Sequence, residues 1–205
     1  MRVTLEKSAF LKALNHVQSV VERRNTIPIL SNVMVQAKGS EVKLTATDLD
    51  LEIVESVAAE VAQEGAATVP AHMLYDIVRK LPDGAQLELN QAGDKGRVAI
   101  VASRSRFALQ ALPPEDFPDL SSGEFGNIFS LAAADLRFLI ERTRFAISTE
   151  ETRYYLNGIY FHEVKQSNHL RAVATDGHRL AQSQMTLPAG AANMPGIIVP
   201  RKTVL

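Results

Sequence analysis

Apolar residues recur at helical spacing in two stretches of the N-terminal half. In the stretch RVTLEKSAFLKALNHV and just beyond it, the recurring positions are Phe10, Leu14, Val17 and Val21. In the stretch VPAHMLYDIVRKLP they are Leu74, Ile77, Val78 and Leu81. Polar side chains fill the opposite face in both stretches, so each pattern predicts an amphipathic helix that packs on a core. Pro82, Asp83 and Gly84 would end the second helix.

Alternating polarity predicts strands after each helix. NVMVQAK and EVKLTATDLDLEIVESV follow the first helix, with a turn at Gly39 and Ser40, and Val42, Leu44 and Ala46 indicate one buried face. AQLELNQ, KGRVAIVAS and RFALQAL follow the second helix. Each half therefore reads β-α-β-β-β, which predicts an α+β fold with helices on one face of antiparallel sheets.

The chain repeats itself at a nearly constant offset. KLTATDLDLEI pairs with RAVATDGHRLA at an offset of 128 residues, and VTLEKSAFLKALNHV pairs with FSLAAADLRFLIERT at 126. PILSNVMV pairs with YYLNGIYF at 126, and TVPAHML pairs with IVPRKTV at 130. Four pairs in one order predict a duplicated domain.

The segment PPEDFPDLSSGEFGN, rich in proline, glycine and acids, predicts the boundary between the copies. Residues 1–121 would form a complete first domain. Residues 122–205 would form a truncated second domain, with its first half and the start of its second helix. We therefore expect the natural protein to continue past Leu205.

Composition places the chain among globular proteins. Of its 205 residues 46% are hydrophobic, which is enough to bury real cores. It has no cysteine, so disulfides and thiolate metal sites are excluded. No apolar run approaches a membrane span, and Glu6 interrupts the stretch where a signal peptide needs an apolar core. We expect a soluble, cytoplasmic protein with no metal and no cofactor.

Charge is distributed unevenly, although the formal net charge is only −1. Five basic residues stand against two acids between Met1 and Leu30, whereas two stand against seven between Ser31 and Pro70. The net charge of the whole chain conceals these local differences. They are compatible either with ordinary solvated surfaces or with a basic surface that binds a polyanion such as a nucleic acid.

The stretch VATDGHRLA suggests chemistry at first sight, because Thr175 and Asp176 stand close to His178. One hypothesis is therefore a small-molecule enzyme that uses Asp176 and His178. The matching turn ATDLDLE keeps Thr47 and Asp48 but has no histidine, and no nucleophile, glycine-rich phosphate loop or metal-spaced histidine pair supports catalysis. We expect no catalytic residues. A second alternative is a repeated protein-interaction scaffold unrelated to DNA.

Several motifs in one order resemble the bacterial DNA polymerase III beta subunits, the sliding-clamp family, over the whole chain. They are TIPILSNV, VPAHMLYDIVRKLPDG, SRSRFALQALPPEDFPDL, RYYLNGIYF, VATDGHRLA and IIVPRK. The resemblance implies a DNA-clamp fold with three similar domains per subunit, the third absent from this chain. Two subunits would close head to tail into a ring that encircles duplex DNA in the bacterial cytoplasm, at the nucleoid. Such a processivity factor catalyses no reaction itself.

The resemblance also implies where DNA and the second subunit would bind. Helices line the hole of such a ring, so basic residues on or near them would meet phosphates without reading sequence. These DNA-binding candidates are Lys12, Arg23, Arg24, Arg79, Lys80, Arg201 and Lys202. Glu150 stands where the family usually has a polar amide near DNA, and a carboxylate there would repel phosphate. In the ring contact Phe107 and Leu109 would pack on the partner subunit, with plain core packing as the alternative.

A surface pocket is the last implied site. It would receive the short peptide motif of the polymerase alpha subunit, the clamp loader and repair proteins. Its apolar lining would be Leu156, Thr175 and Leu180, and its rim Arg153, Gly177 and His178. The third domain supplies the remaining wall in the family, so we expect the isolated chain to bind such peptides weakly. The helix before this region has a less regular pattern, with Leu136, Ile140 and Ile147 on one face and Phe138 and Phe145 on the other.

Overall fold

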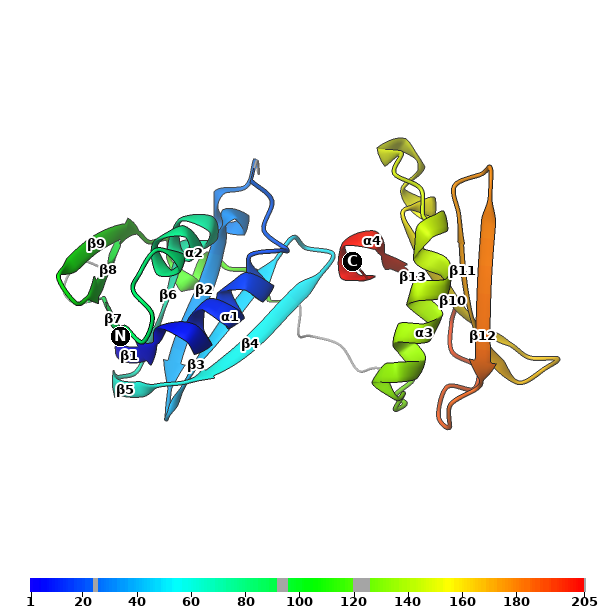
Figure 1. The fold of residues 1–205 in the computed structure, drawn as a ribbon, viewed down its shortest axis with the longest axis horizontal. Helices are drawn as coiled ribbons and strands as arrows, with labels where there is room; N and C mark the ends of the chain where they lie inside the picture. Colours follow the sequence, from blue (N-terminus) through cyan, green and yellow to red (C-terminus); the bar gives the residue numbers. More distant parts are fainter. Residues whose placement is uncertain (24–25, 92–95, 120–125, 205) are drawn as a thin grey trace. The chain divides into compact units, whose positions relative to one another are not determined.

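The computed structural model describes residues 1–23, 26–91, 96–119 and 126–204 (Figure 1). The chain divides into two compact units, Met1–Ser122 and Gly123–Leu205, called unit 1 and unit 2 below. The fold is α+β, with antiparallel sheets and few helices, as predicted.

Unit 1 holds two helices and nine strands in its described residues. In chain order they are β1 (Arg2–Glu6), α1 (Lys7–Val17), β2 (Asn32–Lys38), β3 (Glu41–Thr47), β4 (Glu52–Ala58), β5 (Glu60–Gln63), β6 (Gly65–Pro70), α2 (Ala71–Arg79), β7 (Gln86–Asn90), β8 (Arg97–Ala102) and β9 (Ser105–Gln110). Short 3-10 turns lie at Pro28–Ser31 and Pro114–Asp116. The stretch EVKLTATDLDLEIVESV forms a hairpin of β3 and β4, since residues 48–51 turn the chain back, and the three strands expected after the first helix are present.

The two halves of unit 1 exchange their first strands. The sheets have the orders β5-β1-β7-β8-β9 and β4-β3-β2-β6. Strand β1 belongs to the first half of the sequence but pairs with β7, where Val3 lies opposite Leu89. Strand β6 belongs to the second half but pairs with β2, where Val33 lies opposite Val69. Neither half could therefore complete its sheet alone.

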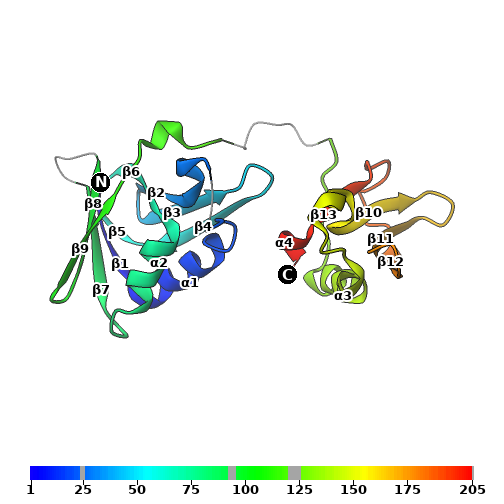
Figure 2. The same ribbon diagram turned by 90° about the horizontal axis from the view of Figure 1, so that it is seen from above.

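The two helices of unit 1 lie side by side in both views (Figures 1 and 2). Helix α1 packs against β3, β4 and α2. The predicted apolar face of the first helix is buried, from Phe10 at 0% exposed to Val21 at 4%. Leu74, Val78 and Leu81 are buried as well, and Ile77 is partly buried. The helical spacing in the sequence therefore identified the core of unit 1 correctly.

Unit 2 repeats part of this arrangement. Its elements are α3 (Ala133–Thr143), a 3-10 turn at Arg144–Ala146, the 3-10 segment η4 (Glu151–Leu156), β10 (Gly158–Val164), β11 (His169–Thr175), β12 (Leu180–Thr186), β13 (Ile197–Pro200) and the short α4 (Arg201–Val204). The sheet order is β12-β11-β10-β13. Strand β13 pairs with β10 as β6 pairs with β2, with Gly158 opposite Pro200 where unit 1 has Asn32 opposite Pro70.

One expectation for unit 2 was wrong in detail. Residues 127–132, which match β1 by the repeat, form no strand. In unit 1 that strand pairs with β7, and the described part of unit 2 contains no equivalent of β7. The irregular pattern of α3 did not single out one buried face. Leu139 is 0% exposed and Ile147 is 6% exposed, but Leu136 is 39% exposed, so the core side of the helix is centred on Leu139.

No helix among the described residues is long and apolar enough to cross a membrane.

Candidate functional site

The turn that joins β11 to β12 is held by the side chains of Thr175 and Asp176. The Thr175 hydroxyl donates to the carbonyl oxygen of Arg179 over 2.7 Å and accepts from the Gly177 N–H over 3.1 Å. The Asp176 carboxylate accepts from the N–H groups of His178 and Arg179, each over 3.0 Å. Gly177 has φ +91°, a left-handed conformation that glycine adopts readily.

A cation and an aromatic ring fasten this turn further. The Arg179 Nε lies 2.9 Å from the second Asp176 oxygen, and its guanidinium lies 5.7 Å from the centre of the Phe145 ring. The backbone N–H groups of Arg179 and His178, together with the Arg179 side chain, lower the pKa of Asp176 to about 2. Asp176 is therefore ionised at neutral pH and serves as the hydrogen-bond acceptor of the turn.

In the turn between β3 and β4 the threonine and aspartate side chains accept hydrogen bonds from the equivalent backbone N–H groups. Thr47 accepts from the Leu49 N–H over 3.0 Å, and Asp48 accepts from the N–H groups of Asp50 over 3.2 Å and Leu51 over 2.9 Å. The Thr-Asp pair is thus a structural device used in both copies, as the repeat predicted. This geometry gives Asp176 a structural role, and the bond that His178 makes to it comes from the backbone and not from the imidazole.

The two turns differ in the side chains that they present. At the offset of 128 residues, Gly177 replaces Leu49 and the apolar Leu180 replaces Glu52. Leu180 is 64% exposed and lies opposite Thr175 in the β11–β12 ladder. The second copy therefore offers an open, apolar edge where the first copy has a carboxylate and a bulkier side chain.

Segment η4 places a second group of predicted pocket residues beside this turn. Arg153 departs from helical geometry, with φ −107° and ψ 56°. Glycine has no Cβ, but an ideal Cβ placed on Gly177 would lie only 3.2 Å from the Arg153 Nη1 atom. The two rim residues are therefore in contact. Leu156 ends η4 and is half-buried, just before β10, the strand next to β11. The structure thus brings Arg153 to Gly177, and Leu180 to Thr175.

Two exposed tyrosines beside Arg153 were absent from the predicted site. Tyr154 is 78% exposed and Tyr155 is 55% exposed, and their rings meet edge to face with centres 5.6 Å apart. Large exposed aromatic side chains are typical of binding surfaces. The motif RYYLNG contained the signal, because two adjacent aromatic residues in a short helical segment cannot both face a core.

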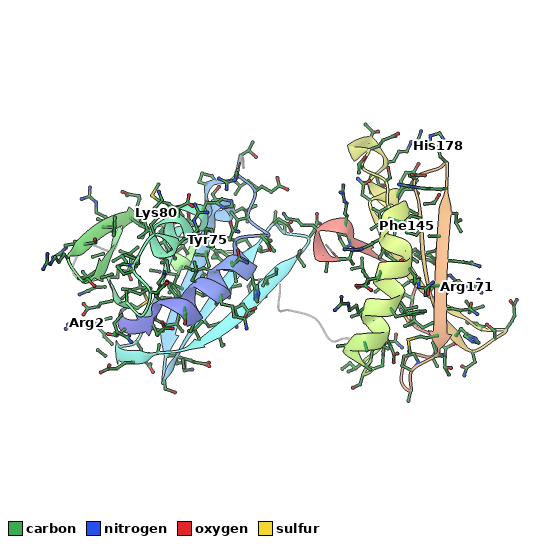
Figure 3. The ribbon with its side chains drawn as sticks, viewed as in Figure 1. Arg2, Tyr75, Lys80, Phe145, Arg171 and His178 are labelled. Carbon is green, nitrogen blue, oxygen red and sulfur yellow. The ribbon has the colours of Figure 1, made fainter. Side chains whose placement is uncertain are left out.

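The predicted DNA-binding cations of unit 1 are exposed where the structure describes them. Lys12 lies on α1, Arg79 and Lys80 lie at the end of α2, and Arg23 follows α1. Figure 3 labels Tyr75, which lies on α2, and Lys80, which directly follows its last residue. Arg79 pairs with Asp76 over 3.0 Å and lies 5.6 Å from the centre of the Tyr75 ring. Arg24 lies outside the described residues.

The last two cation candidates, Arg201 and Lys202, begin α4 and are exposed. The Arg201 N–H donates to the Asn157 carbonyl oxygen over 2.8 Å, which ties the start of α4 to the end of η4.

Lys7, unlike the exposed DNA-binding candidates, is buried and forms a 2.6 Å ion pair with Asp83, so its charge is compensated locally. The pair holds the start of α1 to the turn after α2.

The two residues predicted for a subunit contact differ in accessibility. Leu109 is 2% exposed and lies in the core of unit 1, so its side chain offers little accessible surface. Its place on β9 turns it inward between Ala108 and Gln110, which are exposed. Phe107 is half-buried and lines a groove of about 550 Å³ together with Met73, Ile77 and Leu81. Phe107 is therefore the accessible member of the pair.

Comparison with protein families covers both units. Residues 1–121 match the N-terminal domain of the DNA polymerase III beta subunit, and residues 130–205 match its central domain. The chain is 56% identical over 206 residues to a beta sliding clamp of Caulobacter vibrioides and 41% identical over 208 residues to that of Escherichia coli. Each match covers 100% of this chain and 55% of the relative, so the chain spans about half the length of these proteins.

Solved structures agree with the sequence matches. A sliding clamp from Bartonella birtlesii bound to griselimycin has a TM-score of 0.94 at 55% identity. A Caulobacter crescentus beta sliding clamp has a TM-score of 0.94 at 56% identity. Both cover 100% of this chain and 55% of the compared chain. Because two consecutive domain families match in order along most of its length, this chain belongs to the family of bacterial DNA polymerase III beta subunits, the beta sliding clamps.

Proposed function

We propose that the chain is the N-terminal part of a processivity clamp that encircles duplex DNA and tethers the replicative polymerase. The observation that carries this proposal is the match of units 1 and 2, in order, to two consecutive domains of the clamp family. Residues 1–121 would be the first domain and residues 122–205 the beginning of the second, with a third domain following. A protein that acts on the bacterial chromosome in this way would work in the cytoplasm, without a reaction of its own.

The exposed cations of α1 and α2 would supply the DNA contact. Lys12, Arg79 and Lys80 lie on or at the end of adjacent helices, with Arg23 on the segment that follows α1. Charges of this kind attract phosphates of any sequence, and a closed ring needs no tight contact to remain on DNA. Arg24, Arg201 and Lys202 would contribute in the same way.

The turn after β11 and segment η4 would form one wall of a pocket for partner peptides. Leu156, Thr175 and Leu180 offer apolar surface, and Arg153, Gly177 and His178 form its rim. An extended peptide anchored by a few apolar side chains suits such a surface. The partners would be the polymerase alpha subunit, the clamp loader and repair proteins.

Ring closure would use the groove of unit 1. Phe107 and Met73 both line this groove, and Met73 is 55% exposed. Together they present apolar surface that a second subunit would cover. A head-to-tail homodimer is the closed arrangement that this contact would produce, because the same surface on each subunit meets a different surface on the other.

Retention on circular DNA tests the proposal. The complete subunit is loaded onto nicked plasmid DNA with its clamp loader and separated from free protein by gel filtration. A topological clamp stays with circular plasmid at high salt and is lost after a single cut that linearises it. Equal retention on both forms, or none on either, would contradict encirclement and favour a protein-interaction scaffold.

A further inference from the structure

An ion pair stands at the rim of the proposed pocket, between Glu150 and Arg153. The Arg153 Nε lies 3.0 Å from the Glu150 Oε2. Both side chains are about half exposed, at 47% for Arg153 and 55% for Glu150. The pair is therefore accessible to a ligand that reaches the rim.

The backbone holds the two residues in this arrangement. The Arg153 N–H donates to the Glu150 carbonyl oxygen over 3.1 Å. The Glu150 N–H in turn donates over 3.1 Å to the hydroxyl of Ser148, a residue only 2% exposed. Glu150 is thus tied to a buried serine on one side and to Arg153 on the other, and its carboxylate stays close to the guanidinium without long-range packing.

Arg153 also touches the turn after β11, which belongs to the same wall of the pocket. Its Nη1 atom lies 3.2 Å from the place where a Cβ on Gly177 would stand, in the turn after β11. The nearby cation Arg179 pairs with Asp176 over 2.9 Å, and its guanidinium lies 5.7 Å from the centre of the Phe145 ring. Arg153 is therefore a rim cation that a peptide side chain can reach, with Glu150 as its counterion. Arg179 is exposed as well but has a counterion of its own, Asp176.

We propose that Glu150 sets the charge preference of the pocket. Its carboxylate neutralises Arg153 and repels a second carboxylate, so peptides with an acidic side chain at this rim bind less tightly than they would to a bare arginine. The inference rests on the proposed function, since it assumes that a peptide occupies the pocket. Exposed ion pairs contribute modestly, so the expected effect is about two- to fivefold in Kd.

The experiment compares matched peptides on matched variants of the complete subunit. The probes are pairs of fluorescein-labelled pentapeptides with two leucine anchors. The two peptides of a pair differ at one non-anchor position, where one carries Asp and the other Asn. One pair is made for each non-anchor position. Affinities are measured by fluorescence anisotropy for wild type and Glu150→Gln. At the position that meets Arg153, the Glu150→Gln variant should bind the Asp peptide about two- to fivefold more tightly. The Asn twin should change by less than about 1.5-fold.

Two further variants make the result specific. Glu141→Gln removes the same charge from another exposed ion pair of unit 2, Arg137–Glu141 at 2.8 Å on α3, and should change neither affinity. Adding Arg153→Gln to Glu150→Gln should abolish the gain for the Asp peptide. Equal changes for the Asp and Asn peptides would overturn the role of Glu150 while leaving the pocket intact. No binding of any peptide to wild type or variants would overturn the pocket itself, and with it this inference.

Discussion

Leu49 and Gly177 occupy the same position in two copies of one turn, and both have a left-handed backbone. Their φ angles are +81° and +91°, and each donates its N–H to the threonine two residues earlier. Leucine adopts this conformation only at a cost, whereas glycine adopts it freely. In the second copy the missing side chain leaves room for Arg153, which lies against Gly177. The substitution thus changes the surface while the turn stays the same.

Replacing Gly177 by alanine should destabilise unit 2. The backbone conformation at φ +91° disfavours any Cβ, so we expect a loss of about 1 kcal/mol in the free energy of unfolding. Urea denaturation followed by tyrosine fluorescence measures it, because three of the four tyrosines lie in unit 2. Gly126→Ala is the control, since a Cβ there meets nothing within 4 Å and its φ is not left-handed. Equal effects of the two substitutions would refute the conformational explanation.

The turn after β11 should loosen in acid. The pKa of Asp176 is about 2 when folded, below its ordinary value of 3.8. A lowered pKa stabilises the folded form above pH 3.8, and this contribution is lost as the pH falls through about 2. Amide hydrogen exchange of His178 and Arg179, followed as the pH is lowered from neutral, should show decreasing protection relative to intrinsic rates. Asp176→Asn should remove this pH dependence, and its persistence in that variant would assign it to other groups.

The inner face of α3 can be tested by two leucine substitutions. Leu139 is fully buried, so Leu139→Ala should lower the free energy of unfolding of unit 2 by about 2–5 kcal/mol. Leu136 is 39% exposed, and Leu136→Ala should cost less than about 1 kcal/mol, because little apolar area leaves the core. Urea denaturation of both variants checks the order. A larger effect at Leu136 would contradict the placement of Leu139 at the centre of the core side of α3.

The DNA contact can be separated from overall charge by comparing two lysines of unit 1. Lys12 lies on α1, whereas Lys43 lies on β3 and is also exposed. In the complete subunit, Lys12→Gln should weaken binding to duplex DNA and reduce the slope of log affinity against log salt by about 0.9. Lys43→Gln removes the same charge and should leave both unchanged. Titrations at several salt concentrations decide, and identical effects would argue for an unspecific charge contribution.

Two substitutions on β9, at Phe107 and Leu109, should have different effects on the oligomeric state and the stability of the protein. Phe107→Asp in the complete subunit should give folded monomers, because Phe107 lines the open groove. Leu109→Asp should unfold unit 1, because it buries a charge in the core where Leu109 is 2% exposed. Analytical ultracentrifugation reports the oligomeric state and thermal unfolding reports stability. A Phe107→Asp protein that remains dimeric would remove Phe107 from the subunit contact.

The sequence by itself determined the elements and their repetition. Helical spacing found the buried faces of α1 and α2, since the 3.6-residue period directly reflects which side meets a core. The four matched segments also predicted that Thr175 and Asp176 belong to a structural turn, and the hydrogen bonds of Thr47 and Asp48 are the same.

Only the tertiary structure decided how distant segments pair. The exchange of β1 and β6 between the halves of unit 1 depends on contacts between residues far apart in sequence, such as Arg2 and Asn90, which no local pattern encodes. Phe107 and Leu109 lie on the same face of β9, and packing likewise buried Leu109 in the core and left Phe107 on a groove. The structure also showed that Arg153, which pairs with Glu150, departs from helical geometry, a feature that residue types do not reveal. Periodicity predicts which face of an element is buried, but packing decides what that face meets.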